Sequence, residues 1–164
     1  MTPVPASIRK AIPEDTAVIV EIWKEFMDFH AQRDRHFTRS VDGHQRLADF
    51  MSGRIVHDNS CVVVAEQAEE VVGYCLAVIS RYPPVFLYDT YGTISDLAVS
   101  AAYRRQGIGE ALLEYACAWF AERTITRVEL RVATTNEVST AFWRKMGFRP
   151  YVELLYKECV KRNA

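Results

Sequence analysis

The 164-residue sequence has no apolar run long enough to span a bilayer, and its first ten residues lack the apolar stretch of a secretory signal. It also lacks a strong charge of either sign. The formal net charge is −1, so no long-range field favours nucleic acid or an anionic membrane as a partner. These absences predict that the chain has neither a nucleic-acid partner nor a membrane partner.

Closely spaced cysteine pairs are missing as well. The four cysteines stand far apart, form no CxxC pair and lie in apolar segments: Cys61, Cys75, Cys117 and Cys159. This pattern favours buried, reduced thiols over disulfides or a structural zinc site, because zinc ligands usually come as closely spaced pairs. We therefore expect no metal and a cytoplasmic location, where thiols stay reduced.

What the sequence does have is an ordinary core composition, with 49% hydrophobic and 25% charged residues. No repeat, low-complexity tract or linker interrupts it, so residues 1–164 are expected to form a single domain. Periodicity and turn residues predict α/β (α+β) architecture, with a mixed sheet that is covered by helices on both faces. The expected strands cover residues 8–12, 61–65, 71–79, 93–99, 127–132 and 151–156, and the expected helices cover residues 13–30, 42–55, 107–121 and 138–146.

The most informative stretch runs from Asp96 to Gly109, where a strand leads into a basic, glycine-bearing turn that opens a helix. The first N–H groups of a helix have no internal partner and lie at its positive end, and glycine lets a ligand approach that backbone closely. With Arg104 and Arg105 beside it, the turn suits a phosphate or pyrophosphate. The pattern alone is also compatible with a tight turn that carries two solvated arginines. A P-loop and a GxGxxG dinucleotide fingerprint are both absent.

The combination of Arg104-x-x-Gly107-x-Gly109 with a later Asn136 and Gly147-Phe148 resembles the GNAT superfamily of N-acyltransferases. The opening Ile8-Arg9-x-Ala11-x-Pro13-Glu14-Asp15 is similar to the usual start of that family. The resemblance implies a mostly antiparallel sheet of six to seven strands, with a splay between strands 4 and 5. It also implies acetyl-CoA as co-substrate and a homodimer.

The resemblance further assigns roles to residues. The turn from Arg104 to Gly109 would hold the pyrophosphate of coenzyme A. The strand from Leu97 to Val99 would pair with the pantetheine arm and offer an amide to the thioester carbonyl. Asn136 would contact the arm from the following helix. The expected coenzyme-binding residues are Leu97, Ala98, Val99, Arg104, Arg105, Gln106, Gly107, Ile108, Gly109, Asn136, Ser139, Phe142 and Trp143.

The transfer requires a proton acceptor, because a free alkylamine with a pKa near ~10.4 is mostly protonated at neutral pH. Asp96 is the first candidate for this base; the alternative is a surface or capping carboxylate. Strand alternation places Thr93, Ser95 and Leu97 on the face opposite Asp96. If the substrate lies on that opposite face, a water relay replaces Asp96.

A proton donor to the leaving thiol is less clear from the sequence. Many GNAT proteins have a tyrosine where this chain has Trp143, whose indole N–H does not release a proton at accessible pH. Core packing is the favoured interpretation of Trp143, and Tyr151 or water is the candidate donor. A thiol pKa near ~8.5 means that loss of the donor costs only about 2 kcal/mol at pH 7.

Candidate substrate residues lie outside the family motifs: Phe29, His30, Tyr82, Phe86 and Tyr91. Their aromatic rings suit a cationic amine by cation–π attraction, although loop packing or a dimer contact explains them equally simply. His30 without a placed partner is more typical of a helix end than of a catalytic base. The sequence thus predicts acetylation of a primary amine of a small molecule, such as a polyamine or amino acid. The alternatives are acetylation of a protein N-terminus or lysine, and a non-catalytic coenzyme A-binding regulatory module.

Overall fold

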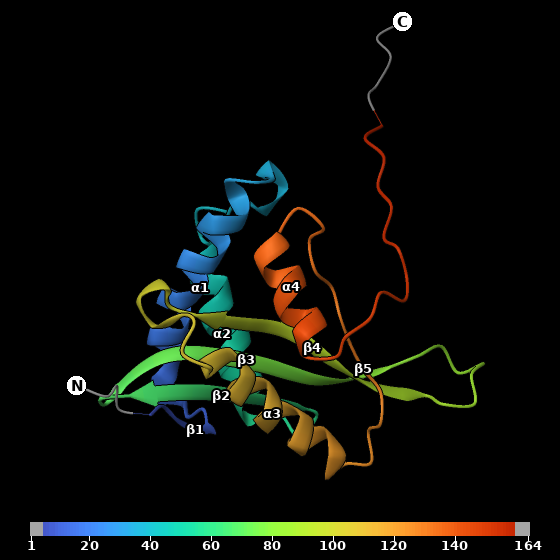
Figure 1. The fold of residues 1–164 in the computed structure, drawn as a ribbon, viewed down its shortest axis with the longest axis horizontal. Helices are drawn as coiled ribbons and strands as arrows, with labels where there is room; N and C mark the ends of the chain where they lie inside the picture. The colour runs from blue at the N-terminus through green and yellow to red at the C-terminus, as the bar shows by residue number, and fades with distance from the viewer. Residues whose placement is uncertain (1–4, 160–164) are drawn as a thin grey trace, which may run out of the picture. The chain divides into compact units, whose positions relative to one another are not determined.

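The computed structural model describes residues 5–159, and Figure 1 shows how their helices and strands are arranged. The chain divides into two compact units, Met1–Arg131 and Val132–Ala164. The first unit contains β1 (Ser7–Lys10), α1 (Thr16–Ala31), α2 (Gly43–Val56), β2 (Ser60–Gln67), β3 (Glu70–Arg81), β4 (Thr90–Val99), α3 (Ile108–Ala121) and β5 (Val128–Leu130). It also has 3-10 turns at Pro13–Asp15, Arg35–Phe37 and Ala101–Tyr103, and the second unit contains α4 (Glu137–Lys145).

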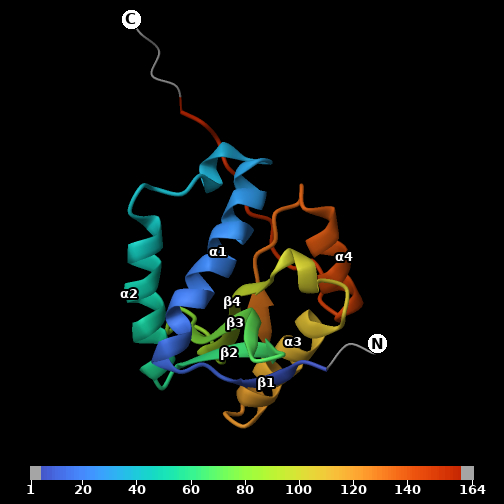
Figure 2. The same ribbon diagram turned by 90° about the vertical axis from the view of Figure 1, so that its left-hand side faces the viewer.

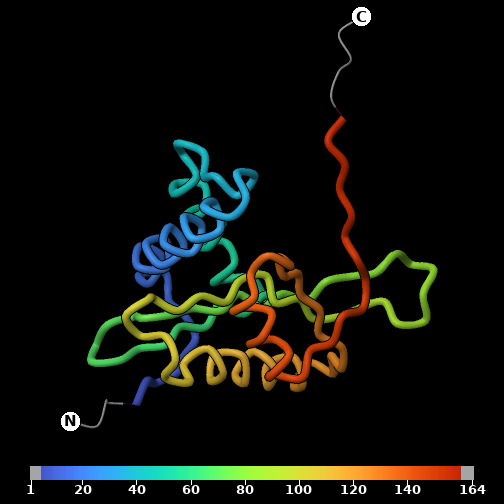
Figure 3. The backbone as a smooth tube through the Cα atoms, turned by 45° about the horizontal axis from the view of Figure 1, so that its top comes forward, coloured from blue at the N-terminus to red at the C-terminus, as the bar shows by residue number. Residues whose placement is uncertain are grey.

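The sheet of the first unit follows the order β1-β2-β3-β4-β5. The first four strands pair antiparallel, and β5 pairs parallel to β4. The expected mixed, mostly antiparallel sheet is therefore confirmed. Figure 3 shows β3 and β4 continuing as a long hairpin, whose tip, in yellow-green, projects away from α1, α2 and α3.

Helices cover both faces of this sheet, as expected (Figure 2). On one face, Ile19 and Ile22 of α1 and Met51 of α2 pack into a buried cluster with Tyr74 and Leu76 of β3. On the other face lies α3, whose Leu112 and Phe120 side chains contact β3 and β4 where glycine leaves room for them. Because both faces are covered, β2 and most of β3 are buried along their length, which explains their continuous apolar sequence.

The chain has an extra residue in β4 that strand alternation does not foresee. Asp96 pairs with Leu76, whereas Ile94 pairs with the adjacent Ala77, so Ser95 forms a β-bulge. Thr93 pairs with Val78, and Val78 and Leu76 lie on the same face of the regular strand β3. Thr93 therefore shares the α1–α2 face with Asp96, and the expectation that it lies opposite is wrong. Leu97 does lie on the opposite face, as expected.

The sheet opens between β4 and β5 where the family resemblance implied a splay. The parallel pairing covers only Gly92–Val128, Thr93–Glu129 and Ile94–Leu130. Beyond Ile94, residues 95–99 of β4 have no strand on that side among the described residues. One edge of β4 is thus free of a neighbouring strand along its last five residues.

Two expectations need correction. The described residues form five strands rather than six or seven, because residues 151–156 have no regular secondary structure. Their Val, Leu and Tyr residues suit a strand, but a strand exists only when its backbone groups pair with those of another strand, and the described part of the second unit contains no strand.

The second correction concerns the cysteines. All four are free, yet Cys117 and Cys159 are exposed rather than buried. Cys117 lies on the face of α3 turned away from the sheet.

The second unit is built around α4 and its two caps. The Asn136 side chain accepts a hydrogen bond from the Ser139 N–H at 3.1 Å, which caps the start of the helix. Gly147 ends it with φ of 88°, in the left-handed region, as the sequence predicted. The N–H of Phe148 donates to the Trp143 carbonyl at 3.0 Å, and the two rings pack 5.3 Å apart, which completes a Schellman motif.

Candidate active site

The turn between β4 and α3 presents a helix start without a side-chain cap to solvent. Arg105 and Gly107 both have left-handed backbone, with φ of 64° and 81°, and Gly107 is the N-cap of α3. Among the described residues no side chain caps this helix, and nothing lies within 4 Å of the position that a Gly107 Cβ would take. The first amides of a 14-residue helix are thus free to receive an anion.

The two arginines of the turn differ in their surroundings. Arg104 donates from Nη2 to Glu25 Oε1 at 2.7 Å and from Nε to the Val99 carbonyl at 2.8 Å. Glu25, on α1, also accepts from the backbone N–H of Ala101 at 2.9 Å. Arg104 therefore ties the turn to α1, while Arg105 and Gln106 are exposed beside the helix start. No sequence motif indicates Glu25, because it is one of several acidic residues on an exposed part of α1.

The free edge of β4 presents backbone groups to a ligand. The Ser100 N–H donates to the Val72 carbonyl at 2.9 Å. In an antiparallel pair every second residue hydrogen-bonds to the same neighbour, so the backbone groups of Asp96, Ala98 and Ser100 bond to β3. The N–H and C=O groups of Leu97 and Val99 therefore point toward the open side, where the Val99 carbonyl already accepts from Arg104 Nε at 2.8 Å. Of the three strand residues expected to bind the pantetheine arm, these two have the backbone orientation that such pairing requires.

Asp96 lies on the α1–α2 face at the bulge and is partly buried. Burial raises the pKa of its carboxyl to about 6, and the nearby Tyr74 hydroxyl opposes that rise. A carboxyl with this pKa is ionised at neutral pH and remains a usable base. The position is thus chemically suited to the role that the sequence suggested.

Tyr74, which the sequence analysis missed, has a hydroxyl that is fully buried. It makes no hydrogen bond of good geometry with the described residues, but it lies near enough to Asp96 for each group to shift the pKa of the other. Burial first, and then the charge of Asp96, raise the pKa of Tyr74. A tyrosine inside an apolar strand run carries no sequence signal that distinguishes it from ordinary core packing.

The candidate substrate residues fall into two groups. Phe29 and His30 pack edge to face at 5.7 Å near the end of α1, where burial lowers the pKa of His30 and favours its neutral form. Tyr82 stacks on Tyr91 at 4.2 Å and contacts Phe86 at 5.9 Å, at the base of the β3–β4 hairpin. Among residues 5–159, no ring contact joins the two groups.

A carboxylate that the sequence did not suggest accompanies the second group. Tyr82 donates a hydrogen bond to Glu129 of β5, which also accepts from Arg127 Nε at 2.7 Å. These hydrogen bonds lower the pKa of Glu129 and keep it ionised, although burial opposes the shift. Because Glu129 pairs with Thr93, it lies on the same sheet face as Asp96.

The remaining candidates belong to the second unit. Trp143 Nε1 donates to Ser139 Oγ at 3.1 Å, and its ring packs against Phe142 at 5.0 Å. The indole N–H is therefore engaged within α4, which agrees with the packing interpretation of this residue. Asn136 Oδ1 is engaged in the N-cap. Tyr151 lies in the segment after α4 and stays a candidate donor.

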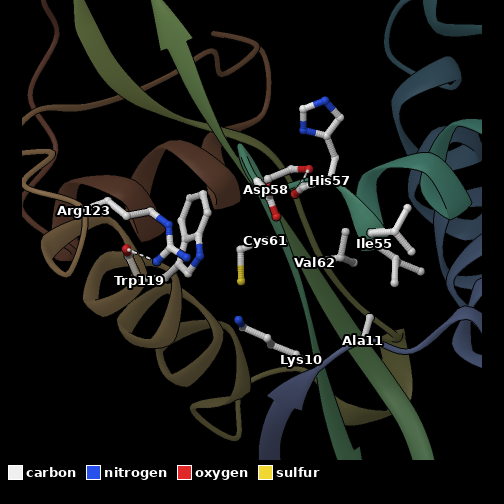
Figure 4. Close-up of a pocket in the computed structure, with 11 residues that line it drawn as sticks. Lys10, Ala11, Ile55, His57, Asp58, Cys61, Val62, Trp119 and Arg123 are labelled. Atoms are coloured by element: carbon white, nitrogen blue, oxygen red, sulfur yellow. Dashed lines mark hydrogen bonds between the residues drawn. The ribbon is translucent and has the colours of Figure 1, made fainter.

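A separate hollow of about 330 Å³ lies at the other end of α3. Figure 4 shows the Cys61 thiol at its centre, with Lys10 on one side and Trp119 and Arg123 on the other. Residues at the end of α2 and the start of β2, among them Asp58, complete its wall. None of the candidate site residues lines this hollow, so it is distinct from the turn at the start of α3.

Two further features of the described chain bear on partners. No helix within residues 5–159 is long and apolar enough to cross a membrane. Within the same residues, no group of three or more His, Cys, Asp or Glu side chains is placed to hold a metal ion.

An open helix start that suits a diphosphate, next to a strand edge that suits an extended amide-bearing arm, defines an acyltransferase that takes its acyl group from coenzyme A. Residues 19–148 match the Acetyltransferase (GNAT) family. Because this match covers more than half of the chain, the protein belongs to that family and is an N-acetyltransferase that uses acetyl-CoA as its co-substrate.

Relatives agree with this assignment, and a solved structure shares the fold. An uncharacterized N-acetyltransferase of Archaeoglobus fulgidus is 28% identical over 142 residues, which cover 87% of this chain and 92% of the archaeal one. The 5-NmdU N-acetyltransferase of Pseudomonas phage PaMx11 is 26% identical over 142 residues, or 86% and 85% of the two chains. A predicted acetyltransferase of Clostridium acetobutylicum, solved with acetyl-CoA, shares the fold with a TM-score of 0.76 at 18% identity, covering 97% of this chain and 99% of that one.

Proposed function

We propose that the acetyl acceptor is a primary amine of a small molecule, such as a polyamine or amino acid, and that Asp96 takes its proton. The observation that carries this proposal is the position of Asp96. It lies at the bulge of β4, beside the free strand edge, with a pKa of about 6. A base next to the edge where the thioester would lie is within reach of an amine that attacks it.

The face that carries Asp96 also favours a cationic ligand. Tyr91 and Thr93 lie on it further along β4, and Glu129 lies beside Thr93 on β5. Residues two apart on one face of a strand are about 6.6 to 7 Å apart, so this row is long enough for a short aliphatic amine. The Tyr82–Tyr91 stack adds aromatic surface at its far end. A second amino group of a polyamine would find two aromatic rings there, beside the Glu129 carboxylate that pairs with Arg127.

Each group of the chain has a defined part in the transfer. Asp96 accepts the proton as the amine nitrogen bonds to the acetyl carbonyl carbon and the carbon–sulfur bond breaks. A backbone N–H of Leu97 or Val99 donates to the carbonyl oxygen, on which negative charge develops. The helix start at Gly107 holds the diphosphate. The thiol of coenzyme A leaves as thiolate or takes a proton from water or Tyr151, and the unassisted route costs about 2 kcal/mol at pH 7.

One relative is named for a particular acceptor. The phage protein that shares 26% identity is named for N-acetylation of 5-NmdU. Its match covers 86% of this chain and 85% of the phage protein, enough to include β4 and the turn that follows it.

The test measures release of free thiol from acetyl-CoA with a panel of diamines, polyamines, amino acids, and peptides with a free N-terminus or lysine. We expect an amine-dependent rate with at least one small amine that exceeds the rate with every peptide. A rate with peptides alone would assign the chain to protein acetylation. If no amine increases the rate of thiol release, the chain is a coenzyme A-binding regulatory module and the proposal is wrong.

We further propose that the protein is a cytoplasmic homodimer. Four large apolar side chains are exposed at the tip of the β3–β4 hairpin: Val85, Phe86, Leu87 and Tyr88. An exposed apolar patch of this kind suits a protein–protein contact. Light scattering after size exclusion should give twice the mass of the 18.8 kDa chain, and Leu87→Asp should return it to a monomer.

A further inference from the structure

Tyr74 of β3 and Asp96 of β4 are neighbours on one face of the sheet. Tyr74 pairs with Ala98, and Leu76, two residues further along β3, pairs with Asp96. The two side chains are therefore diagonal neighbours across an antiparallel pair, a separation that a tyrosine spans easily. Both lie on the α1–α2 face, because Tyr74 and Leu76 belong to the cluster that α1 and α2 cover.

The Tyr74 hydroxyl does not help to stabilise the core in which it lies. Its oxygen is fully buried and lacks a hydrogen bond of good geometry with the described residues. Phenylalanine would fill the same apolar space without burying a polar atom, and a buried hydroxyl normally has a partner. The acceptor that lies beside it is the carboxyl of Asp96. The Asp96 charge raises the pKa of Tyr74, and the Tyr74 hydroxyl in turn lowers the pKa of Asp96.

The other ionisable groups on elements that pack against β4 engage different partners. Cys75 of β3 feels the charge of Asp96 but points to the opposite face. Glu25 of α1 forms an ion pair with Arg104, and Glu129 of β5 forms one with Arg127. His30 of α1 and Cys117 of α3 feel like charges on neighbouring residues, Arg33 and Glu114, rather than the charge of Asp96. On the α1–α2 face, Tyr74 is thus the group that acts on Asp96.

We propose that Tyr74 is a positioning residue for the transfer: its hydroxyl donates a hydrogen bond, directly or through one water molecule, to the Asp96 carboxylate and holds that carboxylate toward the acceptor amine. This inference rests on the proposed function of Asp96 as the base. Tyr74 remains protonated throughout the working pH range, because burial and the charge of Asp96 both raise its pKa. It therefore acts as a fixed donor and does not itself transfer a proton.

The test is Tyr74→Phe, which removes only the hydroxyl and keeps the ring in the core. Loss of the donor should lower kcat about tenfold, leave the KM for acetyl-CoA unchanged, and move the acidic limb of the kcat/KM profile to higher pH. The direction follows because a hydrogen bond to the ionised carboxyl lowers its pKa. The titration of the Asp96 side-chain carbon, followed by NMR in the wild type and the variant, should shift in the same direction.

Tyr115→Phe, on α3, is the matched control and should change neither the pH profile nor the carbon titration. If Tyr74→Phe raises the melting temperature and leaves both titrations where they were, the hydroxyl is only a buried polar group and the inference fails. Asp96→Asn separates the two proposals. A variant that keeps the wild-type rate overturns the function of Asp96, whereas an inactive Asp96→Asn with an unshifted Tyr74→Phe overturns only the role of Tyr74.

Discussion

Asp96 is the residue in which activity and stability oppose one another. Burial raises its pKa from 3.8 to about 6, so between these values the folded chain holds a proton that the unfolded chain has lost. Stability therefore falls as the pH rises through this window, and the whole cost is present above pH 6. The same burial that makes the carboxyl a better base at neutral pH makes the folded protein less stable there.

Replacement by Asn should separate these two effects. Asp96→Asn should lower kcat by about 100-fold or more, since general-base catalysis typically contributes that much. It should also raise the melting temperature at pH 7.5 by a few degrees and lose this advantage near pH 3, where Asp96 is mostly protonated in both the folded and the unfolded state. Calorimetry at the two pH values and thiol release at pH 7.5 measure the outcome.

Asp49→Asn is the control for this substitution. Asp49 is exposed on α2, where it accepts a hydrogen bond only from Gln45 at 3.3 Å. It should change neither rate nor stability by a measurable amount. Equal melting temperatures of wild type and Asp96→Asn at both pH values would show that the carboxyl is not strained by burial.

At the scale of elements, the helices and the first five strands follow from apolar periodicity and from caps. The Gly147 C-cap and the buried pair β2–β3 are examples, because each depends on residues close together in sequence. The bulge at Ser95 could not be predicted, since it is a property of the pairing between β3 and β4 rather than of either strand. Residues 151–156 show the converse, a sequence suited to a strand that has no partner to pair with in the described part of its unit.

The contact between β4 and α3 is set by the absence of a side chain at Gly92. A Cβ at this position would lie 2.7 Å from Phe120 Cζ, and the Phe120 ring is fully buried. Gly92→Ala should therefore lower the free energy of unfolding by about 1–3 kcal/mol, as overpacking does. Gly53→Ala, in α2, is the opposite control: nothing lies within 4 Å, so it should add roughly 0.5–1 kcal/mol. If chemical denaturation gives both variants the same change in the free energy of unfolding, the packing argument is contradicted.

The link between α1 and the turn from Arg104 to Gly109 depends on Glu25. Its carboxylate accepts from Ala101 N and Arg104 Nη2, so Glu25→Ala removes two bonds that hold the turn. Both side chains are about two-fifths exposed, at 41% and 44%, which limits the effect to about two- to fivefold in Kd for acetyl-CoA. Glu21→Ala, whose carboxylate pairs only with Lys24 at 2.7 Å, should leave Kd unchanged. Calorimetric titration of both variants tests whether α1 helps to shape the turn.

For the whole molecule, the sequence predicted the glycine turn and the helix start after β4, whereas the arrangement of side chains around Asp96 emerged only from the fold. The turn from Arg104 to Gly109 depends on glycine and on a helix start, and both are visible in the order of residues. Three other elements contribute residues that come close to β4 and this turn only when the chain folds: Tyr74, Glu25 and Glu129. The acceptor side also depends on which face of β4 each residue takes, which the bulge changes.

Ligand binding at the α3 start should stabilise the entire fold by mass action. At 100 times its Kd, acetyl-CoA would add about 2.7 kcal/mol, which corresponds to a rise of roughly 5–10 °C in melting temperature for a chain of this size. Gly107→Asp should abolish this rise because it places a carboxylate against the phosphates at a backbone with φ of 81°. Gly107→Asn has nearly the same shape, tolerates left-handed backbone and carries no charge, so it should keep most of the rise. If Asn abolishes the rise as completely as Asp does, the glycine is needed for conformation or space rather than for its lack of charge; if neither variant does, the diphosphate lies elsewhere on the protein.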